Sequence, residues 1–107
     1  KSLIPPVKLQ SNILSSSHAR HLFMVQFPVE EMSMNRNELL LELRRLNIGA
    51  SIHYAPLHKM PLYAHAKQSH LPNTERICER VLTLPISASM DLTDADYVIS
   101  KIRQVLK

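Results

Sequence analysis

Alternating and clustered hydrophobic positions predict three short strands in this chain. Residues 22–27 form an apolar run that Pro28 ends, which is typical of a mostly buried strand. Residues 48–54 alternate with a period of two until Pro56, which has no N–H to donate to a ladder. Residues 82–86 alternate in the same way. In the second strand one face is expected to carry Ile48, Ala50, Ile52 and Tyr54, and the other Gly49, Ser51 and His53.

A helix is predicted between the first two strands. Asn35 stands at the N-cap position, and Glu38, three residues on, can complete a capping box. Arg44 and Arg45 fall in the last turn, where cations suit the helix dipole, and Asn47 can end the helix in a left-handed conformation. The stripe that faces the core consists of leucines at helical spacing: Leu39, Leu40, Leu43 and Leu46.

Two more helices are predicted toward the C-terminus. Residues 74–82 are expected to form a short amphipathic helix after an irregular segment at 57–72. The last helix is expected to be capped by Thr93, with Asp96 in its first turn. Its apolar stripe comprises Ala95, Val98, Ile99, Ile102, Val105 and Leu106.

The order of these elements predicts an α+β fold. We expect a small three-stranded, mainly antiparallel sheet with helices packed on one face. Residues 1–17, which include Pro5–Pro6, are interpreted as an extended lead-in or linker from an upstream domain, and residues 18–107 as the folded domain. A chain of 107 residues suffices for one hydrophobic core.

The composition is that of a soluble globular domain, with 45% hydrophobic and 21% charged residues. The sequence contains no run of about 18 apolar residues, so no membrane span is predicted. The N-terminus lacks the features of a signal peptide. The single cysteine, Cys78, cannot form an internal disulfide, which is typical of reducing compartments. We therefore expect a cytoplasmic protein without a membrane partner.

The charge pattern argues against a nucleic-acid partner. The net charge of +4 arises from 13 Lys and Arg against 9 Asp and Glu, and the basic residues are scattered along the chain. A nucleic-acid-binding face needs a clustered basic stripe, often with stacking aromatic rings. The pattern indicates only a modest attraction for small anions.

The chain lacks the motifs of a complete active site. Its six histidines stand at irregular intervals without a second cysteine, so no metal site is expected. One glycine cannot build a glycine-rich phosphate loop or the Gly-x-Ser-x-Gly turn of a serine nucleophile. No catalytic residue is therefore assigned within these 107 residues.

Three ring-bearing residues at the end of the second predicted strand are the candidate ligand contacts. His53 lies on the polar side of that strand, and Tyr54 and His58 follow it. Imidazole and phenol groups can donate hydrogen bonds to phosphate or sugar oxygens, and histidine changes charge near neutral pH. The alternative interpretation, which weighs most for His58, is ordinary packing in the core.

Several short segments with a fixed order and spacing carry a family resemblance. They are His21–Leu22–Phe23, Arg36–Asn37–Glu38–Leu39, residues 47–58, Tyr63, Leu71–Pro72–Asn73–Thr74–Glu75 and residues 79–85. Together they resemble the C-terminal small domain of the DegT/DnrJ/StrS family of pyridoxal-phosphate-dependent nucleotide-sugar aminotransferases. The resemblance covers roughly residues 18–107, and its specificity lies in the set rather than in any one segment.

The resemblance implies a fold-type-I aminotransferase, normally a homodimer, that uses an amino-acid donor to aminate a nucleotide-linked keto sugar in amino-sugar or surface-polysaccharide biosynthesis. The Schiff-base lysine is expected in a larger upstream domain, so pyridoxal phosphate belongs to the full-length protein and this chain alone should not transaminate. By the same resemblance His53 and Tyr54 border the sugar site, and His58 is a further match. No cofactor-binding residue is assigned here.

Two other functions fit the same residues. A dehydratase relative within the family lacks the catalytic lysine, and the upstream sequence would reveal this. A noncatalytic binding or interaction module would need neither the lysine nor the cofactor. A titration with nucleotide sugars, followed by the NMR shifts of the histidines, would distinguish such a module.

Overall fold

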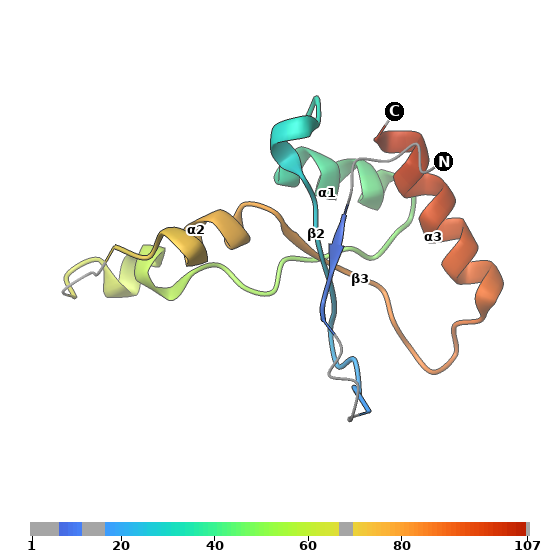
Figure 1. The fold of residues 1–107 in the computed structure, drawn as a ribbon, viewed down its shortest axis with the longest axis horizontal. Helices are drawn as coiled ribbons and strands as arrows, with labels where there is room; N and C mark the ends of the chain where they lie inside the picture. The colour runs from blue at the N-terminus through green and yellow to red at the C-terminus, as the bar shows by residue number, and fades with distance from the viewer. Residues whose placement is uncertain (1–6, 12–16, 67–69, 107) are drawn as a thin grey trace.

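The computed structural model of the protein describes residues 7–11, 17–66 and 70–106 (Figure 1). Its centre is a three-stranded antiparallel sheet with the order β1-β2-β3. The strands are β1 (Lys8–Leu9), β2 (Phe23–Gln26) and β3 (Val81–Leu84). In the register, Val25 lies opposite Leu9 on one side and Leu82 on the other. The predicted mainly antiparallel, three-stranded sheet is confirmed.

The sheet differs from the prediction in which segment supplies the third strand. Residues 48–54 form no strand; Ser51 alone bridges to Thr83, with backbone hydrogen bonds of 3.0 Å and 2.8 Å in the two directions. Alternate burial survives at Ile48 and Ala50, because both side chains pack into the core whether or not a ladder continues. The third strand is β1, which lies in the predicted lead-in.

The side chains beyond this bridge also depart from the predicted alternation. Tyr54 was expected on the buried side with Ile48, yet 71% of its surface is exposed, since the chain leaves the sheet after Ser51. In the last strand all four residues of β3 are buried rather than alternating. Ile86, predicted as part of that strand, lies beyond it and is exposed.

Helix α1 (Arg36–Arg45) matches its prediction closely. The Asn35 side chain accepts hydrogen bonds from the backbone N–H groups of Asn37 and Glu38, and the Glu38 carboxylate accepts one from Asn35 N, which completes the capping box. Asn47 follows the helix with a φ of 58°. Because the cap and the stop depend on near neighbours, the sequence predicts both.

The other two helices begin earlier than predicted. Helix α2 (Pro72–Cys78) starts with a proline, whose missing N–H is not needed in a first turn, and it ends before β3. Helix α3 (Leu92–Val105) is capped by Asp91 rather than Thr93. Asp91 forms a capping box with Asp94, and the Thr93 hydroxyl donates to the Asp91 carboxylate at 2.6 Å.

The hydrophobic core lies on one face of the sheet, under α1 and α3. Its largest fully buried side chains are Phe27, Leu39, Leu43 and Leu82, and Ile102 joins them from α3. Helix α1 packs on β3 and on α3. The expected α+β fold with helices on one face is therefore confirmed, and the opposite face of the sheet is left for other contacts.

A second part of the chain projects away from this core (Figure 1). It comprises residues 54–66 and 70–78, which contain two short 3-10 helices, η2 (Leu57–Lys59) and η3 (Pro61–Tyr63), and α2. We call it the arm. The radius of gyration is 15.6 Å, against about 13 Å for a compact domain of this length. No helix in the described part of the chain is long and apolar enough to cross a membrane.

Candidate functional site

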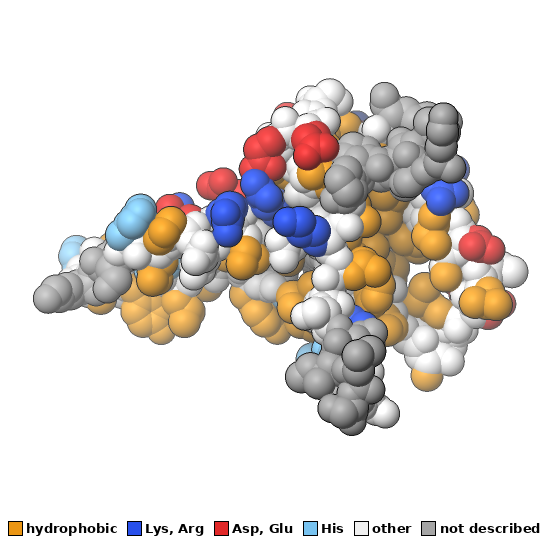
Figure 2. Space-filling view, in the orientation of Figure 1, with side chains coloured by type: hydrophobic (Ala, Val, Ile, Leu, Met, Phe, Trp, Pro, Cys, Tyr) orange, Lys and Arg blue, Asp and Glu red, His pale blue; other side chains and the backbone are white. Residues whose placement is uncertain are grey.

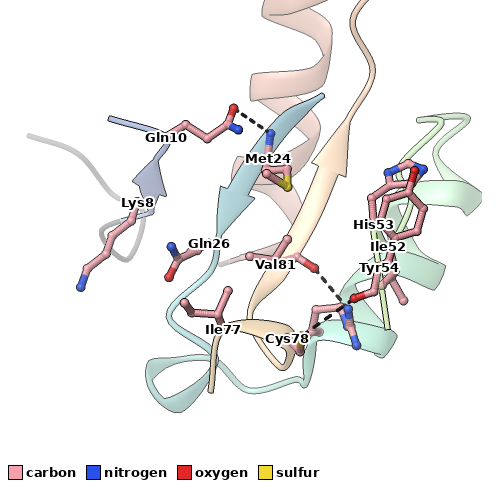
Figure 3. Close-up of a pocket in the computed structure, with 11 residues that line it drawn as sticks. Lys8, Gln10, Met24, Gln26, Ile52, His53, Tyr54, Ile77, Cys78 and Val81 are labelled. Atoms are coloured by element: carbon pink, nitrogen blue, oxygen red, sulfur yellow. Dashed lines mark hydrogen bonds between the residues drawn. The ribbon is translucent and has the colours of Figure 1, made fainter. Parts of the chain in front are cut away.

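A pocket of about 220 Å³ lies on the face of the sheet opposite the core (Figure 3). Its walls come from the first two strands, from the segment after the Ser51 bridge and from the end of α2. The lining side chains belong to Lys8, Gln10, Met24, Gln26, Arg36, Ile52, His53, Tyr54, Ile77, Cys78 and Val81. The pocket therefore joins the sheet to the root of the arm.

His53 is held in this pocket by β3. Its Nδ1 lies 2.9 Å from the Thr83 hydroxyl, and Thr83 is the buried polar residue that also bridges to Ser51. This contact occupies Nδ1 and leaves Nε2 for a further hydrogen bond. The half-buried imidazole is thus oriented by the core while it faces a pocket, which suits a ligand contact.

Tyr54 stands beside His53 at the mouth of the pocket. The two rings meet edge to face, with 5.0 Å between their centroids and an interplanar angle of 76°. The Tyr54 carbonyl oxygen lies 3.9 Å from Cys78 Sγ, which ties this segment to the end of α2. The structure therefore brings two of the three predicted site residues into one pocket.

His58 lies outside the lining of this pocket and binds within the arm. Its Nε2 is 3.2 Å from the Glu75 carboxylate, and Lys59 Nζ is 3.1 Å from the other oxygen of the same carboxylate. The hydrogen bond from Lys59, followed by that from His58, lowers the pKa of Glu75. The three residues join η2 to α2, so His58 links two elements of the arm.

The pocket carries basic side chains and no acidic one among its lining residues. Lys8 comes from β1, and Arg36 comes from the first turn of α1. Arg36 Nη1 donates to the Val81 carbonyl at 3.2 Å, and Arg36 Nε is buried without a hydrogen-bond partner among the described residues. Burial lowers the pKa of the Arg36 guanidinium, which nevertheless stays protonated at neutral pH.

The sequence analysis did not identify most of the polar residues that line the pocket. Gln10 and Gln26 line the pocket because β1 pairs with β2, and the two-residue strand β1 has too little pattern to be predicted. The signal that could have found Gln26 is the alternation along β2, where Val25 faces the core and its neighbours face the other way. Nothing local in the sequence points to Arg36.

Comparison with known proteins places this chain in a family. The model of the DegT/DnrJ/EryC1/StrS aminotransferase family matches residues 3–103. The chain belongs to this family. The resemblance seen in the sequence is thereby confirmed.

Individual relatives support the same assignment. The spore coat polysaccharide biosynthesis protein SpsC of Bacillus subtilis is 34% identical over 94 residues, which are 84% of this chain and 24% of SpsC. DesV of S. venezuelae, solved with a ketimine intermediate, has a TM-score of 0.78 and 28% identity over 96% of this chain and 27% of DesV. A Streptococcus pneumoniae protein described as a sugar aminotransferase, Spr1654 in its PMP form, has a TM-score of 0.70 and 26% identity over 80% of this chain and 22% of its own.

The chain spans about a quarter of the length of the curated relatives that it matches. The pocket described above does not by itself suit pyridoxal phosphate. It offers no carboxylate to the pyridine nitrogen, and its volume of about 220 Å³ is below the range of about 300–1,000 Å³ common for small-molecule sites. These residues are suited to form one wall of a larger site.

Among the described residues no group of three or more His, Cys, Asp or Glu side chains is placed to hold a metal ion. His58 and Glu75 contact each other in the arm, and the third residue of this cluster is Lys59, whose side chain is a cation. This cluster is therefore suited to an ion pair.

Proposed function

We propose that the full-length protein is a pyridoxal-phosphate-dependent aminotransferase acting on a nucleotide-linked keto sugar, and that this chain is its C-terminal small domain. The observation that carries the proposal is the pocket that holds His53 and Tyr54 together on a fold of this family. The cofactor, when bound by the full-length protein, supplies an electron sink for transfer of the amino group. The expected amino donor is an amino acid such as glutamate.

The role proposed for this chain is to bind and orient the sugar. His53 Nε2 and the Tyr54 hydroxyl can form hydrogen bonds with sugar hydroxyls, since the Thr83 contact already fixes the imidazole. The phosphate groups of a nucleotide would meet Lys8 and Arg36 without repulsion, because no acidic side chain lines the pocket. His58, through Glu75, supports the arm beside this wall.

The biological setting is proposed from the same relationship. SpsC is named as a spore coat polysaccharide biosynthesis protein, and Spr1654 is described as a sugar aminotransferase. We place the full-length protein in amino-sugar or surface-polysaccharide biosynthesis, as a cytoplasmic homodimer. These 107 residues alone are not expected to transaminate.

The test uses the full-length protein with pyridoxal phosphate, glutamate and a panel of nucleotide-linked keto sugars. Formation of the amino sugar, followed by mass spectrometry, is expected for at least one substrate. His53→Ala should raise KM for the sugar or lower kcat with little loss of fold, because it removes a substrate contact from a formed pocket.

The control is His21→Ala, which removes an exposed histidine outside the pocket and should leave the kinetics unchanged. Absence of any amino-sugar product would contradict the proposed reaction. A folded His53→Ala enzyme with unchanged KM and kcat would contradict the proposed role of His53.

A further inference from the structure

One glutamine in the wall of the pocket has its amide orientation fixed by two hydrogen-bond donors. Gln10 follows β1, and its Oε1 accepts from Met24 N (Figure 3) and from Arg20 Nη1, both at 3.4 Å. The oxygen and nitrogen of a glutamine amide are assigned from such a network, because the reversed amide would set its NH2 group against two donors. The Nε2 hydrogens of Gln10 are therefore the donors that remain for the pocket that this residue lines.

Arg20 reaches Gln10 from a backbone conformation that few residues other than glycine adopt. Its φ is 50°, in the left-handed region. A residue in this region persists when its surroundings hold it, and such residues cluster at ligand sites. The Arg20 backbone N–H donates to His18 Nδ1 at 2.9 Å, and its guanidinium lies over the Phe23 ring, 5.9 Å from the centroid. These contacts hold the Arg20 side chain beside Gln10.

The wall around Gln10 offers further hydrogen-bond donors. Lys8 makes no ion pair among the described residues, and Arg36 Nε is buried there without a partner. Both residues line the pocket with Gln10, and no carboxylate does. Figure 2 shows Lys and Arg side chains gathered where the arm meets the rest of the molecule. A ligand group that faces Lys8, Gln10 and Arg36 must therefore bring acceptor oxygens, since these three groups offer donors.

We propose that Gln10 is a specificity-determining contact for the nucleotide-linked sugar and that Arg20 is its positioning residue. Gln10 Nε2 donates a hydrogen bond to a phosphate or sugar oxygen of the substrate. Arg20 does not line the pocket and acts through Gln10. This inference rests on the proposed function, because it places that substrate in this pocket.

The test measures dissociation constants by titration calorimetry with the full-length protein. The probes are UDP-glucose, dTDP-glucose and GDP-mannose, which carry phosphate and sugar oxygens but no keto group, so they bind without being aminated. Gln10→Glu keeps an acceptor for Met24 N and Arg20 and replaces the NH2 donor by a charged oxygen. The dissociation constant of a probe that the wild type binds should rise at least about tenfold, because one donor is lost and a negative charge faces the phosphates. Tm should not fall.

Gln104 in α3 provides the matched control. Its Oε1 also accepts from a cation, Lys101 Nζ at 3.3 Å, and it lies outside the pocket. Gln104→Glu makes the same change of charge and should leave the dissociation constant unchanged. Where Gln10→Glu fails to fold, Gln10→Met removes the same donor with a side chain of similar length.

A double-mutant cycle tests the positioning role of Arg20. Arg20→Ala alone should raise the dissociation constant of the probe about threefold or more, because it releases the Gln10 amide. In a Gln10→Met background the same substitution should have no further effect, since the group that Arg20 positions is absent. An equal loss of affinity in both backgrounds would show that Arg20 acts apart from Gln10.

Two results would overturn the role of Gln10. One is an equal dissociation constant for the wild type, Gln10→Glu and Gln10→Met, and the other is a wild-type protein that binds none of the three probes. The proposed function fails by a different measurement. A protein that shows the Gln10 effect and aminates no keto sugar would retain this inference and lose the function. An enzyme that aminates a keto sugar and binds the probes equally well with Gln10→Glu would retain the function and lose this inference.

Discussion

At the scale of single residues, the candidate site depends on how one imidazole is held. His53 was predicted from its position on the polar side of an alternating segment, and the structure adds the partner that orients it, Thr83, thirty positions away. Tyr54 was predicted as a site residue and lies in the same pocket, although on an exposed stretch rather than a strand. The residue types and their sequence neighbours indicated which chemistry the site could carry. The tertiary contact with Thr83 sets the orientation of the His53 ring.

Thr83→Val tests this orientation with a side chain of nearly the same shape. We expect kcat/KM of the full-length protein to fall by about 2- to 12-fold, the equivalent of one lost hydrogen bond of about 0.5–1.5 kcal/mol. Steady-state kinetics measure the effect, and Thr74→Val, an exposed threonine in α2, is the control. Unchanged kinetics in Thr83→Val would show that His53 needs no help from the hydroxyl.

Two leucines in α1 test the predicted core stripe. Leu43 is fully buried, and Leu41, two positions earlier, is 57% exposed. Leu43→Ala should lower the free energy of unfolding by about 2–5 kcal/mol because it leaves a cavity. Leu41→Ala should change it by less than about 0.5 kcal/mol. Denaturant unfolding measures both, and equal values for the two variants would contradict the assignment of the buried face.

At the scale of elements, helices were predicted better than strands. The capping box of α1 and the left-handed Asn47 form between near neighbours, so their residues appear in the sequence within a few positions of one another. The cap of α3 was displaced by two residues because Asp91 and Thr93 are both good caps. The prediction of a strand at 48–54 was wrong. Alternating hydrophobic and polar residues show which side chains are buried, and Ile48 and Ala50 are buried here without a continuous partner strand.

The arm offers a test of an electrostatic contact between elements. The pKa of Glu75 is lowered in the folded protein by Lys59 and then His58. Its contribution to stability is therefore present above the ordinary Glu pKa of about 4.3, and it is lost as the pH falls through the lowered value. Glu75→Gln should have a lower Tm than the wild type near pH 6, and the difference should shrink below about pH 4.

Thermal unfolding between pH 7 and pH 3 measures this difference. Glu31→Gln is the matched control, because Glu31 makes no ion pair in the described part of the chain. A Tm difference for Glu75→Gln that persists undiminished at pH 3 would contradict an electrostatic origin.

At the scale of the whole molecule, the chain divides into a packed core and a projecting arm. The core joins β2, β3, α1 and α3 into one apolar cluster, whereas η2 and η3 contact each other and Glu75 joins α2 to η2. This division explains why the molecule measures 47 × 38 × 26 Å, longer than a compact domain needs to be. It also places the pocket between the two parts.

Amide hydrogen exchange of these 107 residues should show the same division. Slow exchange is expected in β2, β3 and α1, which all contribute buried side chains to the core, and exchange should be at least about tenfold faster in η2, η3 and α2, which have no buried residue. Uniform protection across core and arm would contradict this picture, and would show that the arm is stable without a covering surface.

The sequence by itself determined the helix caps, the leucine stripe of α1, the family and the candidate residues His53 and Tyr54. Each of these depends on residue types at short, fixed spacing, which is where capping, amphipathic packing and motif chemistry operate. Only the tertiary structure decided that β1 completes the sheet, that Thr83 holds His53, and that His58 binds Glu75. These contacts join residues 16 to 30 positions apart, and their formation depends on chain folding rather than on local preference.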